Sequence, residues 1–300
     1  MLNKKENLQA LENFSEQLEV EGRSLWQDAR IRFMRNKAAM ISLCILFVIT
    51  LAVIFLPMMA QFTYEDTDWY AMNAAPTAEH IFGTDALGRD IYVRTLIGGR
   101  ISLMVGVMGA LVAVIIGTLY GATSGFLGGR IDRIMMRLLE ILYAIPFMFL
   151  VIVLVTFFGR NIMLIFVAIG AIAWLDMARI VRGQTLSLRS KEFIEAAHVC
   201  GVSNWRIITR HIVPNVLGIV VVYSTLLIPN MILTESFLSF LGLGVQEPMT
   251  SWGALLQEGA NTMEIAIWQL GFPAAFMVIT LFCFNYVGDG LRDALDPKDR

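Results

Sequence analysis

Six stretches of the chain contain no Asp, Glu, Lys or Arg and are long, or nearly long, enough to cross a lipid bilayer. They are residues 38–56, 101–129, 141–159, 161–175, 212–234 and 265–288. A helical span needs about 20 residues. The runs are too long and too uniformly apolar for the alternating strands of a membrane barrel, and lipid accepts only helices and closed barrels. The pattern predicts an all-α membrane protein with six transmembrane helices.

Two of these runs do not have the length of one span. Residues 161–175 are too few, and reach full length if Asp176 and Met177 lie at the level of the lipid headgroups. Residues 101–129 are more than a span needs, so we expect the glycine-rich end of this run to lie outside the apolar core. The glycines of that end are Gly121, Gly125, Gly128 and Gly129.

Basic residues are divided unevenly between the segments that connect the runs. Nineteen of the 23 Lys and Arg residues lie in residues 1–37, in a loop around Arg130, Arg133 and Arg137, in 179–211 and in the tail. The alternate segments hold only Arg89, Arg94, Arg100 and Arg160. Because basic residues are retained on the cytoplasmic side, both termini are predicted to be cytoplasmic, in agreement with an even number of spans.

The segment before the first run is polar and basic. Its first apolar run begins only after residue 37, so we expect no cleaved secretory signal. Residues 22–37 mix Trp26, Phe33 and Met34 with arginines, which favours a helix lying on the anionic inner surface. Farther upstream, Leu8, Leu11 and Leu18 fall near one helical face, but a solvated flank is an equal alternative for residues 1–20.

Two outer segments are long enough to fold, about 61–99 and 235–264. Residues 236–246 are uncharged but too few to span, which favours a re-entrant or interfacial segment; the alternative is the outer end of the fifth span. In the first segment, residues 82–90 combine glycines with Asp85, Arg89 and Asp90. This is typical of a tight turn with paired charges, and we favour a folded loop over a direct ligand site.

Composition excludes several classes of protein. The chain is 57% hydrophobic and 16% charged, against about 45–50% and about 25% in a soluble protein. An ordinary water-soluble enzyme and a disordered chain are therefore excluded, and the net charge of −2 gives no basic footprint for nucleic acid. Cys44, Cys200 and Cys283 are too far apart in sequence for a disulfide scaffold or a metal site, and are interpreted as small buried hydrophobes.

Chemistry within the spans is sparse. The histidines lie outside the apolar runs, and the sequence has no H-E-x-x-H, G-x-S-x-G or phosphate-loop motif. Four acidic residues, Glu140, Asp176, Glu235 and Asp289, fall at span ends, where we expect capping, pairing or anchoring. A secondary carrier usually has ionisable groups near the midplane, so this class is disfavoured, although prolines within the spans leave it open. The chain has the features of a transport path that does not supply its own driving energy.

The longest inner loop is the best candidate for the place where energy enters. Residues 191–199 are good helix formers, and Gly201 follows where a positive φ is needed for a turn. Ser203 then caps a second short helix that carries Trp205, and Pro214 suits the first turn of the next span. We therefore predict a helix, a turn and a helix lying flat beneath the membrane, with small alanines that let a partner approach closely.

The same residues carry a resemblance to a known family. The run Glu195-Ala196-Ala197, followed by Gly201 and by Ile-x-Pro at 212–214, is similar to the "EAA" loop of bacterial ABC importer permeases. In that family the loop docks into a groove on the ATP-binding subunit and transmits its closure to the channel. The resemblance implies that ATPase coupling is carried by Glu195, Ala196, Ala197, Gly201 and Ser203.

Other segments extend the resemblance over most of residues 80–297. HIFGTDALGRD at 80–90, ESFLSFLGLG at 235–244 and GDGLRDALDP at 288–297 are similar to the oligopeptide, dipeptide and nickel permeases. The N-terminal segment most resembles the second, C-type subunit of the oligopeptide system. A dipeptide or nickel importer is the alternative, and a self-sufficient carrier or a scaffold that transports nothing would be a different class.

The resemblance implies a type I permease fold within a five-part machine in the bacterial inner membrane. A second, homologous permease would complete the path, two ATP-binding subunits would bind ATP and Mg²⁺ and dock on residues 180–213, and a periplasmic protein would deliver peptide. This chain would hold no cofactor, no metal and no catalytic residue, and would bind no nucleic acid. Its parts would be residues 1–37 (cytoplasmic), 38–60 (first span), 61–99 (periplasmic), 100–290 (permease core, with periplasmic loop 235–264) and 291–300 (cytoplasmic tail).

Overall fold

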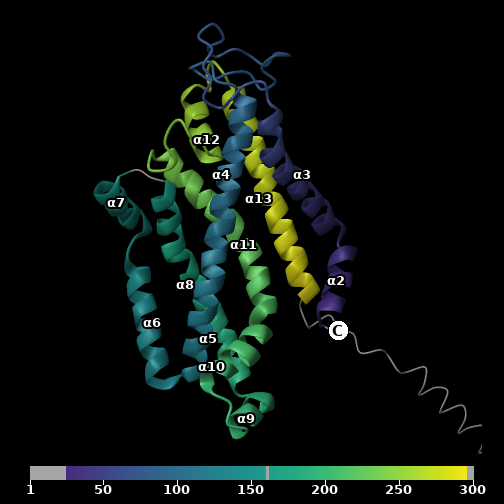
Figure 1. Cartoon of the computed structure of the whole chain (residues 1–300), viewed down its shortest axis with the longest axis vertical. Coiled ribbons are helices and arrows are strands. Elements are labelled where there is room, and N and C mark those ends of the chain that lie inside the picture. Colours follow the sequence, from purple (N-terminus) through teal and green to yellow (C-terminus); the bar gives the residue numbers. More distant parts are fainter. Residues whose placement is uncertain (1–24, 160–161, 296–300) are drawn as a thin grey trace, which may run out of the picture.

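The computed structural model describes residues 25–159 and 162–295 and, within them, is built of helices joined by loops. The first half contains α2 (Leu25–Arg35), α3 (Lys37–Met59), α4 (Ile91–Val112), the π-helix η1 (Ala113–Gly117), α5 (Thr118–Leu127), α6 (Gly129–Ala144) and α7 (Phe147–Phe158). The second half contains α8 (Ile162–Arg189), α9 (Glu192–Val199), α10 (Asn204–Ile207), the π-helix η2 (Ile208–Ile212), α11 (Val213–Phe240), α12 (Trp252–Asn261) and α13 (Trp268–Leu295). In Figure 1 the long helices run between an end that carries α12 and an end that carries α9.

Among the described residues, four helical segments are long and apolar enough to cross a membrane. They are Lys37–Met59, Ile91–Leu127, Asn204–Phe240 and Trp268–Leu295, and the pair α6 and α7 raises the number to five if it forms one span. The all-helical fold is thus confirmed within the described residues, and several of the predicted spans correspond to helices that are long and apolar enough to cross a membrane. The apolar runs gave helices of this length because no polar backbone group can be left unbonded in lipid.

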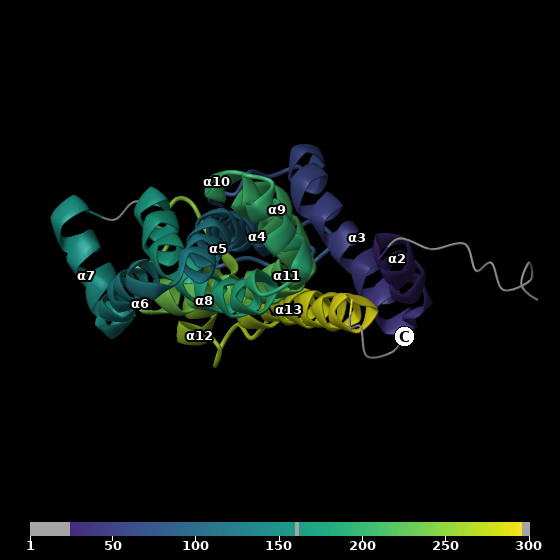
Figure 2. The same cartoon turned by 90° about the horizontal axis from the view of Figure 1, so that it is seen from below.

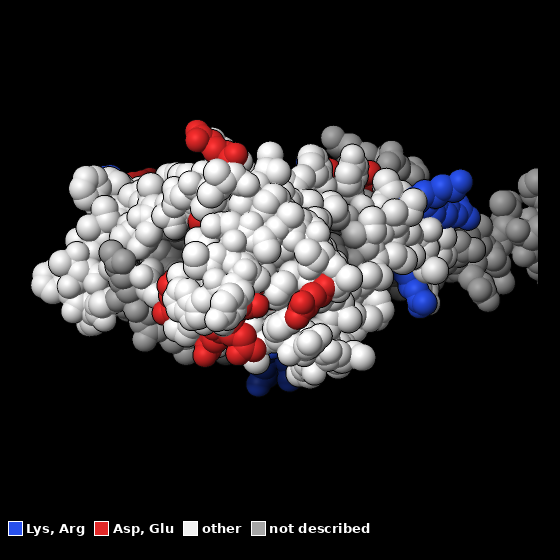
Figure 3. Space-filling model, turned by 90° about the horizontal axis from the view of Figure 1, so that it is seen from above, with Lys and Arg blue, Asp and Glu red and all other residues white. Residues whose placement is uncertain are grey.

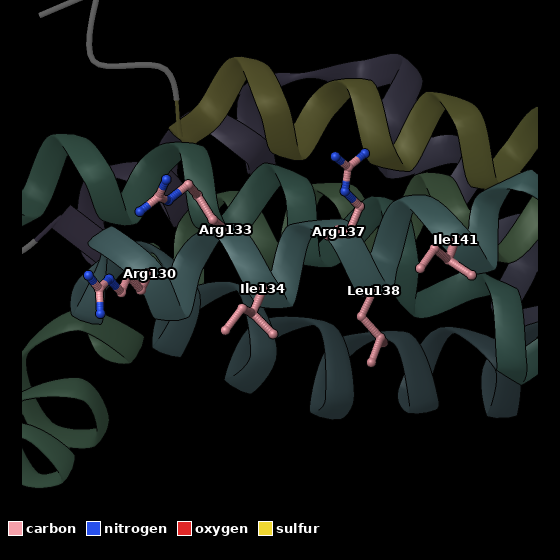
Figure 4. A pocket seen from close by; sticks show the side chains of 6 residues that line it. All are labelled: Arg130, Arg133, Ile134, Arg137, Leu138 and Ile141. Carbon is pink, nitrogen blue, oxygen red and sulfur yellow. The ribbon is translucent and has the colours of Figure 1, made fainter.

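The third apolar run is not one straight helix. Pro146 follows the last turn of α6, and α7 leaves at 74° to it. Proline cannot donate a backbone hydrogen bond and pushes the residue before it out of the helical region, and Ile145 is accordingly extended, with ψ 117. Arg130, Arg133 and Arg137, expected in a loop, instead lie on α6, along a shallow cleft of about 560 Å³ shared with three apolar side chains (Figure 4).

The glycine-rich end of the second run is helical and packed. Gly121 and Gly125 are buried in α5 against α8, and a methyl group at Gly125 would lie 2.8 Å from Cβ of Thr185. These glycines therefore let two helices approach closely, as small residues do in membrane bundles. Only Gly128 and Gly129, with φ of +64 and +57, form the turn into α6.

The segments before and after the spans pack on each other. The described part of the predicted interfacial helix is α2, and Phe33 packs against a cluster that includes Cys283 and Val287 of α13. Trp26 and Met34 are exposed. The interpretation of Leu8, Leu11 and Leu18 lies outside the described residues.

Three further expectations are settled by the helices. Residues 236–240 belong to α11, so the first half of the supposed re-entrant segment is the outer end of that helix, which was our alternative. Asp176 lies near the middle of α8, because this helix continues to Arg189. Cys44 and Cys200 are exposed and only Cys283 is buried, so the expectation of three buried cysteines is wrong for two of them.

Candidate functional site

The predicted loop helix is present as α9, at the end of the molecule opposite α12 (Figure 1; Figure 2 looks onto this end). Glu192 and Glu195 lie in its first turn, where the partial positive charge of a helix N-terminus favours them. Glu195 and Ala196 are exposed, whereas Ala197 is buried. The helix thus exposes the first two residues of the predicted coupling run and turns the third inward.

The turn after α9 is closed by Gly201. The amide of Gly201 donates to the carbonyl of His198 (2.9 Å), and the amide of Val202 donates to the carbonyl of Ala197 (3.1 Å). This pair of bonds is the Schellman ending of a helix, which places its glycine in the left-handed region. Gly201 has φ of +73, as predicted, and no atom lies within 4 Å of where its Cβ would be.

The second predicted helix is not a separate element. Ser203 stands at the N-cap of α10, but its side chain makes no capping hydrogen bond. From Asn204 the helix continues through η2 into α11 without a break, and Pro214 lies in the first turn of α11. The prediction of a free helix–turn–helix is therefore wrong in its second half, because α10 is the end of a membrane helix.

The inner side of this region belongs to the main hydrophobic core. Ile194, Ile207 and Ile208 are each at most 2% exposed and join the same buried cluster. The rings of Phe126 and His198 stack with centroids 5.5 Å apart, which fixes α9 to α5. A force applied to α9 or α10 therefore acts on the packed helices directly.

The outer side carries large apolar groups in the open. Phe193 is 42%, Val199 88% and Trp205 59% exposed. We call these three residues, with Glu195 and Ala196, the tip surface. Trp205 was noticed in the sequence only as part of a helix, and Phe193 and Val199 were missed. Helical spacing could have identified them, because they fall on the sides of the short helices away from the buried isoleucines.

A second cluster of charged residues lies near the α12 end. Arg94 is fully buried, and its guanidinium donates to Glu258 (2.6 Å) and to Asp85; Arg89 donates to Asp85 (2.6 Å) and to Glu247 (3.0 Å). Burial alone would lower the pKa of Arg89, but the hydrogen bond and charge of Asp85, with the two glutamates, raise it.

This cluster joins the two outer segments. The side chain of Asp90 caps α4 at the amide of Val93 (2.9 Å) and also bonds the His80 ring (2.9 Å). Gln269 of α13 donates to the carbonyl of Thr84 (2.9 Å). Residues 82–90 are therefore a folded loop with paired charges, as we favoured. Arg94 of α4, Glu247 and Glu258 are members of the cluster that the sequence did not reveal.

Comparison with known proteins now identifies the family. Residues 113–300 match the family described as the binding-protein-dependent transport system inner membrane component. The chain belongs to this family. Residues 24–76 match the N-terminal transmembrane domain of oligopeptide transport permease C. The resemblance found in the sequence is therefore confirmed, and the chain is an inner-membrane transport permease.

Several relatives are similar over nearly their whole length. The chain is 70% identical to the oligopeptide transport system permease protein OppC of Escherichia coli K12, over 100% of both chains. It is 66% identical to OppC of Haemophilus influenzae, covering 95% of this chain and 92% of that one. It is 45% identical to the dipeptide transport system permease protein DppC of Bacillus subtilis, covering 92% and 87%.

Proposed function

We propose that this chain is one of two permease subunits of an ATP-binding-cassette importer that moves oligopeptides across the bacterial inner membrane. The observation that carries the proposal is the 70% identity, over 100% of both chains, to an oligopeptide permease. The dipeptide permease is more distant, at 45%. Oligopeptides are therefore favoured over dipeptides or nickel as the substrate.

The chain crosses the membrane six times in this proposal, with both termini in the cytoplasm. The crossings are α3, α4 to α5, α6 to α7, α8, α10 to α11, and α13. Their support is the six uncharged runs and the excess of Lys and Arg at alternate connections. Acidic side chains gather over the α12 end in Figure 3, and that end would face the periplasm.

Energy would enter at the tip surface. Two ATP-binding subunits would bind the ATP and Mg²⁺, and one of them would cover the tip surface of this chain. Exposed Trp and Phe beside a charged residue are typical of the energetic centre of a protein interface. Because α10 is continuous with α11, closure of the ATPase pair would move a membrane helix without a flexible link.

The remaining partners lie outside this chain. A second, homologous permease would form the other half of the path, and a periplasmic binding protein would deliver peptide to the α12 end. Lipid would surround the rest. A self-sufficient secondary carrier is the competing class, and transport by this chain reconstituted alone would favour it.

Peptide uptake by a strain that lacks this gene tests the substrate. Labelled di-, tri- and pentapeptides and nickel are supplied to the deletion strain with and without the gene. We expect the gene to restore tri- and pentapeptide uptake. Restoration of nickel or dipeptide uptake alone would support the alternative importers, and restoration of none would contradict the proposed transport function.

The docking proposal has its own test in α9. Glu195→Gln removes a charge from the tip surface, and Glu192→Gln removes one from the same helix turn outside it. We expect Glu195→Gln to lower ATP-dependent uptake several-fold with unchanged abundance in the membrane, since an interface hydrogen bond to a charge contributes about 1.5–3 kcal/mol. Equal behaviour of the two variants would contradict the assigned role of Glu195.

A further inference from the structure

Three polar side chains meet where α6 approaches α8. The hydroxyl of Tyr143 donates to the carboxylate of Asp176. The guanidinium carbon of Arg179 lies over the Tyr143 ring, 4.1 Å from its centroid. Tyr223 of α11 adds a second phenol close enough to interact electrostatically with Asp176. A phenol of α6 and an acid and a cation of α8 thus lie together, with Tyr223 of α11 nearby.

Part of this cluster is exposed, although Tyr223 also packs against the main hydrophobic core. Tyr143 is 38% exposed, Arg179 is exposed, and Asp176 and Tyr223 are half-buried. Within the described residues Arg179 has no ion pair, although it follows an apolar run by only four residues. Arg179 is the first basic residue of the inner connection 179–211, and a guanidinium at this depth faces water, a partner or a substrate in place of lipid.

The polar face continues along α11. Asn230 and Thr234 follow Tyr223 at intervals of seven and four residues, which places all three on one side of the helix. Asn230 is exposed, and its side-chain NH₂ donates only to the Leu226 carbonyl of its own helix (3.2 Å) among the described residues. The second amide hydrogen and the carbonyl of this exposed carboxamide are open to a polar group outside the chain.

The opposite flank of the molecule, formed by α3, exposes apolar side chains. The exposed middle of α3 carries Phe47 (64%), Val48 (62%) and Phe55 (54%). Such side chains suit lipid tails, which offer no hydrogen bonds. The flank formed by α6, α8 and α11 also exposes apolar side chains, such as Ile134 (69%) and Ile141 (60%), but the polar cluster interrupts them.

We propose that the face bearing Tyr143, Asp176, Arg179, Tyr223 and Asn230 is this chain's wall of the peptide path. This inference rests on the proposed function. A peptide carries an ammonium group, a carboxylate and backbone amides. Asp176 would bind its cationic groups, Arg179 its carboxylates, and Asn230 its amides, so that a charged peptide replaces its hydration with protein contacts as it passes.

Charged tripeptides test the proposal in the complete five-chain transporter, with each peptide saturating the binding protein. The probes are trilysine, trialanine and triglutamate. We expect Asp176→Asn to lower the uptake rate of trilysine, relative to that of trialanine, about tenfold. Arg179→Gln should lower the uptake rate of triglutamate, relative to that of trialanine, by a similar factor. A tenfold loss is about the size expected when one hydrogen bond to a charged group is removed. Asp176→Asn keeps an acceptor for Tyr143, so the contact between α6 and α8 is retained.

Matched variants and the ATPase rate separate the possible outcomes. Arg137→Gln and Asp289→Asn change exposed charges on other helix faces, and should leave the ratios between the three peptides unchanged. An equal loss for all three peptides, or a loss of basal ATP hydrolysis in step with uptake, would overturn the proposal in favour of a structural cluster. Failure of the unaltered transporter to move any peptide would instead refute the proposed function, and this inference with it.

Discussion

Gly201 and Gly183 show how a single residue is constrained by the backbone alone. Apart from chain neighbours and the backbone of its own helix, neither has a heavy atom within 4 Å of where a Cβ would lie. Gly201 has φ of +73, whereas Gly183 lies within α8. A left-handed conformation costs a residue with a Cβ about 1–2 kcal/mol. The glycine that ends α9 is therefore required for its backbone conformation and not for space.

Replacing these two glycines by alanine should have different effects on peptide uptake and on stability. Gly201→Ala should strain the turn that orients α9 and lower peptide uptake at normal abundance in the membrane. Gly183→Ala should leave uptake unchanged and raise thermal stability by about 0.4–1 kcal/mol, because alanine has fewer unfolded conformations. Uptake and melting of the purified transporter are the measurements, and unimpaired uptake by Gly201→Ala would contradict the role of the turn.

The effect on stability of replacing Arg94 depends on the charged residues around it. Arg94→Met would remove one of the two cations that Asp85 and Glu258 share near the α12 end, and would leave Arg89, at 2.6 Å from Asp85 and 3.7 Å from Glu258, as the other. Removing one partner of a buried ion pair costs about 3–5 kcal/mol. We expect a marked fall in the melting temperature of the purified transporter. Arg100→Met, which loses only hydrogen bonds to carbonyls of α3, is the control and should lower the melting temperature less. If Arg94→Met lowers it no more than Arg100→Met does, the charged cluster does not stabilise this end of the molecule.

At the scale of elements, the joints between helices matter more than the helices themselves. The break before Pro146 bends α7 away from α6 by 74°, whereas the joint at η2 keeps α10 in line with α11. A π-helix accommodates an extra residue without interrupting the helix, and is frequent at functional sites. The α9 end of the chain, where we propose docking, thus continues without a break into α11.

The tip surface should bind the ATPase subunit through its exposed aromatic residue. We expect Trp205→Ala to weaken copurification of the ATP-binding subunits, with a loss of about 2 kcal/mol or more, as for the centre of an interface. Trp69→Ala is the matched control, since Trp69 is 66% exposed but lies in the loop at the α12 end. If both variants retain the ATPase equally, the tip surface is not the docking site.

At the scale of the whole molecule, the two ends differ in charge. The loops at the α12 end expose the acidic residues Glu65, Asp66, Asp68, Glu79, Glu247 and Glu264. The described part of the chain keeps Arg89 and Arg94 of that end in buried ion pairs. The α9 end exposes Arg130, Lys191, Arg206 and Arg210. This asymmetry is the basis of the proposed orientation.

Single cysteines at the two ends test that orientation. The native Cys44, Cys200 and Cys283 are replaced by serine, and Tyr70→Cys (101% exposed) or Val199→Cys (88% exposed) is added. A membrane-impermeant thiol reagent applied from the periplasmic side should label Tyr70→Cys and not Val199→Cys. Labelling of Val199→Cys in intact cells would contradict the proposed orientation.

The sequence by itself determined the features that depend on neighbours along the chain. Uncharged runs predicted helices long enough to span, because lipid leaves the backbone no other partner. Helix formers at 191–199 and a glycine at 201 predicted α9 and its left-handed turn, because capping energies act within a few residues. The family resemblance rested on the same local segments.

Only the tertiary structure decided what depends on residues far apart in the chain. The bond from Arg94 to Glu258 spans 164 residues, and no local pattern ties one to the other. The contact of Tyr143 with Asp176 likewise depends on how α6 packs on α8. Continuity from α10 to α11, and the burial of the α5 glycines, were also invisible in sequence. In each case the stabilising partner is set by packing, which a window of neighbouring residues does not contain.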